Sequence, residues 1–167
     1  MALGLKELRE QTWDLDPYDL DGVFVSPSVL GWTFILGHDA GWSGNPGPDT
    51  EISQLLCDLS RRFGEAQFFT NHRVVSLAGW ARAVEGQIVR AYVNADDVRW
   101  DEGGLTDEER ELGFENFVRL DTKVEELGEL DIPDESDVMT LAGRWSINPE
   151  ELDAYESEGP GFLGDLN

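Results

Sequence analysis

The chain has 167 residues, of which 40% are hydrophobic and 28% charged, as is typical of a folded globular protein. Asp and Glu number 35 against 12 Lys and Arg, which makes the formal net charge −23. A surface this acidic repels nucleic acid and anionic membranes. We therefore expect no direct binding to either, and we expect basic partners or imitation of a polyanion.

The N-terminal sequence predicts a cytoplasmic protein. Its first residues, MALGLKELREQTWDLD, lack the apolar core of a signal peptide. No apolar run approaches the ~20 residues of a transmembrane helix. The single cysteine, Cys57, has leucine neighbours and is expected to be a buried thiol on a helix.

Two strands are expected early in the chain, at Val23–Val25 and Gly31–Gly37. The second is apolar on one face and largely apolar on the other, which is typical of a central strand. A Gly/Pro-rich loop follows at His38–Pro48 with Trp42 in its middle. An aromatic residue on a polar loop serves as a recognition anchor or folds back on the core, and the sequence leaves both possibilities open.

The candidate for catalysis is the pair His38 and Asp39, at the end of an expected strand. A histidine beside a carboxylate at that place acts either as a general base or as a loop cap. The sequence holds no nucleophile elbow, phosphate loop or metal-binding motif. We expect no catalytic residue, no metal and no cofactor, so the protein is predicted not to be an enzyme.

A helix is predicted from Asp49 to the stop signal at Gly64. It is followed by the acid-poor stretch Ala66–Asn94, which predicts a strand and then a hairpin with its turn at Glu85-Gly86. Pairing Val84 with Gln87 predicts a ladder in which large residues face small ones. In that register Arg82 lies opposite Val89, Trp80 opposite Ala91, and Ala78 opposite Val93.

The negative charge is concentrated in the C-terminal part of the chain. Residues 1–94 carry 12 acidic and 7 basic side chains, a net charge of −5, whereas residues 95–167 carry 23 and 5, a net charge of −18. Trp100 stands among acidic residues in this part. The expected partner-binding residues are Trp42, Asp96, Asp97, Trp100, Asp101 and Glu102.

Two further helices are expected in this acidic part. Thr106 to Glu109 forms a capping box that opens a short helix. Pro133–Trp145 carries an apolar stripe at helical spacing. We expect one α+β domain over residues 1–155, with a mostly antiparallel sheet and helices packed on one face. Residues 156–167 are expected to form a frayed tail.

Five segments carry a resemblance to a group of small acidic bacterial proteins of similar size, to which no activity is assigned. The resemblance covers about Ile52 to Leu152, and its motifs are Leu59–Phe69, Gly79–Ala83, Gly86–Tyr92, Trp100–Gly103 and Trp145–Pro149. In general character the chain is also similar to immunity proteins that neutralise antibacterial toxins. That similarity implies a cytoplasmic inhibitor whose acidic surface binds a basic toxin domain.

Three functions remain open at this point. The first is the immunity protein, with tryptophan anchors among the carboxylates. The second is a DNA mimic that occupies a nucleic-acid-binding protein. The third is a small enzyme centred on His38 and Asp39, which requires a pocket with converging polar groups.

Overall fold

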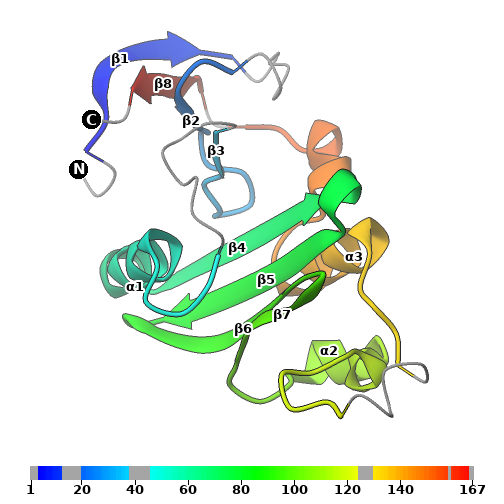
Figure 1. Cartoon of the computed structure of the whole chain (residues 1–167). Helices are drawn as coiled ribbons and strands as arrows, with labels where there is room; N and C mark the ends of the chain where they lie inside the picture. The colour runs from blue at the N-terminus through cyan, green and yellow to red at the C-terminus, as the bar shows by residue number, and fades with distance from the viewer. Residues whose placement is uncertain (1–3, 13–19, 38–45, 124–129, 158, 166–167) are drawn as a thin grey trace. The chain divides into compact units, whose positions relative to one another are not determined.

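The computed structural model describes residues 4–12, 20–37, 46–123, 130–157 and 159–165 (Figure 1). Within these ranges the chain forms two four-stranded antiparallel sheets and three α-helices, so the predicted α+β class is confirmed. It divides into two compact units, one made of Met1–Asn45 with Glu151–Asn167 and the other of Pro46–Glu150. The two units are described separately.

The first unit is a sheet with the strand order β1-β8-β2-β3. Phe24 and Val23 are fully buried in this unit, and Leu163 packs with Phe24. A Cβ on Gly161 would collide with the ring of Phe24, so glycine is needed where β8 passes it. The strands are β1 (Lys6–Gln11), β2 (Val23–Val25), β3 (Ile35–Leu36) and β8 (Gly161–Asp165).

This sheet differs from the expectation in two places. The strand predicted over Gly31–Gly37 is reduced to Ile35–Leu36 and lies at the edge, because residues 29–32 form a tight turn closed by a Val29–Trp32 bridge. The predicted frayed tail is wrong for residues 161–165, since β8 pairs with both β1 and β2. The glycines of β8 interrupt the alternation of apolar and polar residues that would have indicated a strand. The same glycines allow β8 to fit between its neighbours.

The second unit is built on an antiparallel meander with the order β4-β5-β6-β7. The helices α1 (Glu51–Phe63), α2 (Asp107–Glu111) and α3 (Glu135–Trp145) pack around it. The strands are β4 (Glu65–His72), β5 (Leu77–Val84), β6 (Gln87–Ala95) and β7 (Asp97–Glu102), and the 3₁₀ turns are η2 (Arg73–Val75) and η3 (Phe114–Asn116). A further 3₁₀ turn, η5 (Pro149–Ala154), begins in this unit and ends in the other.

The β5–β6 hairpin turns at Glu85-Gly86 as predicted, and Val84 pairs with Gln87. The predicted register is wrong beyond that point, because a β-bulge inserts Val89 as an extra residue. Arg82 therefore lies opposite Arg90, Ala78 opposite Asn94, and Trp80 opposite Tyr92. The Trp80 and Tyr92 rings stack with their centroids 5.0 Å apart.

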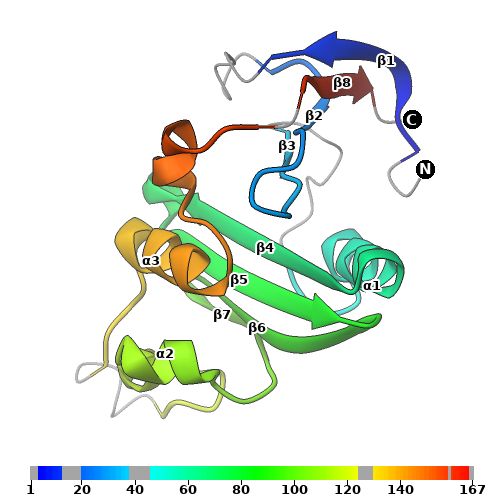
Figure 2. The same cartoon turned by 180° about the vertical axis from the view of Figure 1, so that it is seen from behind.

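Helices cover both faces of this sheet, whereas the sequence predicted only one covered face. Figures 1 and 2, which view the molecule from opposite sides, show α1 on one face and α3 on the other. Neighbouring residues of a strand point to opposite faces of the sheet. Trp80 and Ala81 are both fully buried, so both faces are covered at this point. The hydrophobic periodicity of each helix revealed its apolar side but did not reveal which face of the sheet it would cover.

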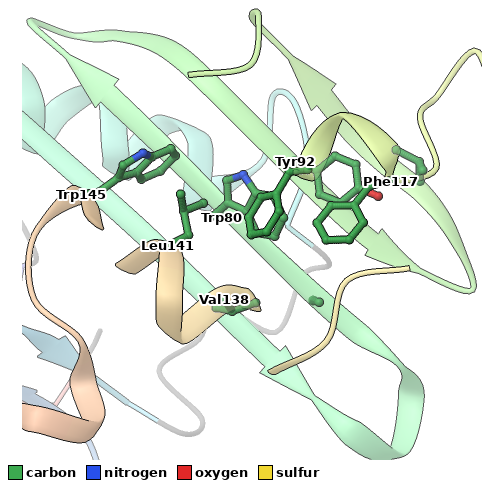
Figure 3. Packing of buried hydrophobic residues seen from close by; sticks show 9 residues of the cluster. Trp80, Tyr92, Phe117, Val138, Leu141 and Trp145 are labelled. Carbon is green, nitrogen blue, oxygen red and sulfur yellow. The ribbon is translucent and has the colours of Figure 1, made fainter. Parts of the chain in front are cut away.

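The largest apolar cluster lies between α3 and the sheet (Figure 3). The sequence predicts one sheet-and-helix interface that buries Trp80, Tyr92, Leu56, Leu59 and Val138 together. The cluster does join Trp80 and Tyr92 to Val138. Leu56 is buried outside it and Leu59 is only half-buried, so the prediction is wrong for the two leucines. The other members are Ala78, Val98, Phe114, Phe117, Leu141 and Trp145.

Candidate protein-binding surface

Three of the carboxylates expected to bind a partner lie on the surface around β7. Asp96 and Asp97 form the tight turn into the strand, with Asp96 at a positive φ of 59°, and Glu102 ends it. All three are exposed. Arg99 approaches Asp97 at 3.5 Å, which makes a weak surface ion pair. These carboxylates remain available to a partner.

Asp101 belongs to the interior. Its side chain is 7% exposed and lies between two arginines. Arg90 Nη1 is 2.9 Å from Oδ1, and Arg119 donates to both carboxylate oxygens at 2.6 Å. A carboxylate satisfied in this way holds strands and loop together, so Asp101 is a structural residue.

Trp100 is also interior, which corrects the prediction that it is an exposed anchor. It is 2% exposed, lies opposite Val93 on β6, and donates its indole N–H to Glu102 at 2.9 Å. The acidic residues on either side of Trp100 hid a β-strand, because Asp and Glu have low strand propensity. The expected anchor Trp42 and the candidate pair His38 and Asp39 lie outside the described residues.

Helix α2 adds carboxylates that the sequence did not assign to the surface. The predicted capping box is present: Thr106 Oγ1 accepts from the amide of Glu109, and the Glu109 carboxylate accepts from the amide of Thr106. The box fixes which residues point outward. Asp107 is 95% exposed at the side chain, and Glu111 is also exposed.

Glu109 is the residue that sequence reasoning missed. It is 0% exposed and accepts hydrogen bonds from two side chains besides closing the cap. Arg90 Nε lies 2.8 Å from Oε1 and 2.9 Å from Oε2, and Trp80 Nε1 lies 2.8 Å from Oε1. The capping box signalled the helix but not the burial of this carboxylate, which follows from the bulge that turns Arg90 inward.

The arginines of the sheet form ion pairs within the protein, and Arg90 is the buried one. Because Arg82 and Arg90 alternate with apolar neighbours, the sequence predicts ion pairs with the acidic segments rather than phosphate binding. Arg90 pairs with Asp101 and Glu109 as predicted, whereas Arg82 pairs with Glu65 at the start of β4. On the outside, Arg110 meets Asp107 at 2.8 Å and Arg144 meets Glu111 at 3.7 Å. Exposed ion pairs of this kind are screened by solvent, so each contributes little free energy.

Among the described residues of this unit, three ionisable groups have shifted pKa values. Burial, reinforced by the charge of Asp101, raises the pKa of Tyr92, whose hydroxyl donates to the carbonyl of Val118 at 2.7 Å. A hydrogen bond from its own backbone amide lowers the pKa of Glu108. Partial burial raises the pKa of Asp137, the last residue of the α3 capping box. Tyr92 is therefore a neutral donor, and Glu108 is a charged carboxylate beside the exposed ones of α2.

A hollow of about 410 Å³ lies beside the start of α3, lined by polar and charged residues that include Arg73, Glu135 and Asn148. Arg73 forms an ion pair with Glu135 there at 2.7 Å. Among the described residues no three His, Cys, Asp or Glu side chains are grouped to hold a metal ion.

Helices long and apolar enough to cross a membrane are absent from the described part of the chain. Comparisons with protein-family models, with curated proteins and with solved structures find no match.

Proposed function

We propose that this protein binds a basic protein partner through the exposed carboxylates of β7 and α2. We propose further that it acts in the cytoplasm as an immunity protein, by blocking the basic cleft of a cognate antibacterial toxin. It would do so as a stoichiometric inhibitor with no chemistry of its own. The β7–α2 surface is defined here as the side chains of Asp96, Asp97, Glu102, Asp107 and Glu111.

One observation carries this proposal: the buried arginine of this region is neutralised inside the protein, while five carboxylates of β7, its preceding turn and α2 lie exposed on the surface. Arg90 is 1% exposed at its side chain and is neutralised by Asp101 and Glu109. Of the exposed carboxylates, Asp97 meets the half-exposed Arg99 at 3.5 Å and Glu102 accepts the indole N–H of Trp100. Asp107 and Glu111 meet exposed arginines in pairs that solvent screens. The negative potential of the exposed carboxylates therefore extends into solvent, where it steers a basic partner and favours its docking.

The experiment compares two variants with the same net charge. The surface variant neutralises the β7–α2 surface by Asp→Asn and Glu→Gln changes. The control variant neutralises five exposed carboxylates of the other unit, namely Glu7, Glu10, Asp21, Glu151 and Glu156. Each protein is immobilised and used to capture partners from the native host at low salt.

We expect the wild type and the control variant to retain the same basic protein, and the surface variant to lose it. The captured protein is then produced in a test cell, where it should be toxic unless this chain is co-produced. Equal capture by the surface variant would place the interface elsewhere. A captured partner without toxic activity would leave the binding function but remove the immunity role.

A further inference from the structure

Helix α2 is held on the sheet by a charged side chain. It has five residues, and Glu109 is its one buried residue. A helix of this length has no stability of its own in water, so its position depends on tertiary contacts. Leu105 and Leu112 pack against the core from just outside the helix, but within α2 the contact with the sheet is made by Glu109.

The four hydrogen bonds to Glu109 come from three different places. Oε1 accepts from Trp80 on β5 and from Arg90 on β6, and Oε2 accepts from Arg90 and from the amide of Thr106. Arg90 is itself held by Asp101 and by the carbonyls of Ala91 and Glu102. These contacts fix the position and the orientation of the Glu109 carboxylate relative to the sheet. Because Glu109 belongs to α2, they also fix the position of the helix.

We propose that Glu109 is a positioning residue that fixes the orientation of α2. Through it, the exposed carboxylates of α2 keep one arrangement relative to β7; the use of that arrangement for a partner rests on the function proposed above. An apolar side chain at this position would bury area equally well, but it would not set the rotation of the helix. Buried charge pairs often add little stability while they specify one geometry.

The test compares Glu109→Gln with Leu112→Ala. Glutamine keeps the size of the side chain but replaces one acceptor oxygen by a donor NH₂, which opposes the N–H groups that point at it. Leu112→Ala removes apolar packing beside α2 and leaves the charged network intact. Backbone ¹⁵N relaxation of residues 107–111 and the exchange rate of the Trp80 indole N–H are measured in both variants.

We expect the order parameters of α2 in Glu109→Gln to fall from about 0.85, the value of a rigid backbone, to below about 0.6. The Trp80 indole proton should exchange faster in the same variant. Leu112→Ala should leave both readouts close to those of the wild type. A rigid α2 in Glu109→Gln, or equal loosening in the two variants, would overturn the proposal.

A second variant covers the case in which Glu109→Gln does not fold. Arg90→Lys keeps the positive charge but loses the guanidinium, whose Nε–H is shared by both oxygens of Glu109 while Nη1 donates to Asp101. It should loosen α2 in the same way while the protein still folds, and a rigid α2 in this variant would count against the proposal. Because no partner is present in these measurements, their outcome is independent of the binding function.

Discussion

Arg90 and Glu109 face each other inside the second unit, with Arg90 Nε 2.8 Å and 2.9 Å from the two carboxylate oxygens. Their side chains are 1% and 0% exposed. The pair exists because the bulge at Val89 shifts the register of β6, which turns Arg90 into the interior. One extra residue in a strand thereby connects β6 to a helix that begins at Asp107, 17 positions after Arg90.

Removal of Arg90 should therefore cost far more stability than removal of a surface arginine. Arg90→Met leaves Glu109 buried without its cation and Asp101 with Arg119 alone, and breaking a buried pair in this way costs about 3 to 5 kcal/mol. Arg110→Met is the control, because Arg110 pairs with Asp107 in solvent and should cost about 0 to 1 kcal/mol. Urea unfolding followed by circular dichroism measures both. Similar losses in the two variants would mean that the buried network does not form.

The turn after β7 offers a matched pair of glycines. Gly103 has a φ of +76°, and a Cβ there would collide with the carbonyl oxygen of Val89, whereas Gly104 has open space around it. Gly103→Ala should destabilise the fold by about 1 to 3 kcal/mol or more through backbone strain and the collision. Gly104→Ala should change the midpoint of thermal unfolding little. An equal effect of the two substitutions would contradict the close approach of the turn to the bulge.

In α1 the two leucines that the sequence treated alike should now differ. Leu56 is 4% exposed and Leu59 is half-buried. Leu56→Ala should cost about 2 to 5 kcal/mol, as does the loss of a fully buried leucine, and Leu59→Ala should cost less. Denaturant titration of both variants checks the order. A larger loss at Leu59 would require a different rotation of α1 about its axis.

Local signals predicted the elements of the fold well. Gly64 ends α1 and the Glu85-Gly86 turn closes the hairpin, both as expected. The two longer helices begin within two residues of their predicted starts, after the caps Thr50 and Asp134. Each of these depends on a few adjacent residues, whose backbone preferences are strong enough to be read directly from the sequence.

The candidate site was harder to predict, because it depends on register and on long-range contacts. An alternating pattern identifies a strand, but a bulge exchanges the two faces beyond it, so Arg90 is buried and Val89 is exposed. A list of acidic residues likewise does not separate Asp101, which is paired inside, from Asp96, which is on the surface. That distinction needs the positions of arginines distant in sequence.

Trp100→Ala should lower the stability of the fold. If Trp100 were an exposed anchor, the same substitution would instead raise the dissociation rate of the partner. The ring of Trp100 is buried against the sheet, so truncation should cost about 3 to 5 kcal/mol. Thermal unfolding gives the loss of stability, and binding is measured at a temperature where the variant is folded. An unchanged unfolding midpoint with faster dissociation would restore the anchor role.

The last prediction concerns the charge of the β7–α2 surface. Exposed charges act over a Debye length of about 30 Å at 10 mM salt and about 8 Å at physiological ionic strength. The association rate of a basic partner should therefore fall by about 10-fold or more between these conditions, while the dissociation rate changes little. Stopped-flow measurements on the wild type give the slope of the rate against salt.

The surface variant should start from a lower association rate and show a flatter slope, whereas the control variant of equal net charge should follow the wild type closely. Asp101→Asn should behave differently again. It should destabilise the fold, because it weakens the contacts of Arg90 and Arg119, and it should leave the salt dependence of association almost unchanged. If the two five-residue variants lowered the rate equally, only the net charge of the protein would steer the partner, and the β7–α2 surface would lose its role as the interface.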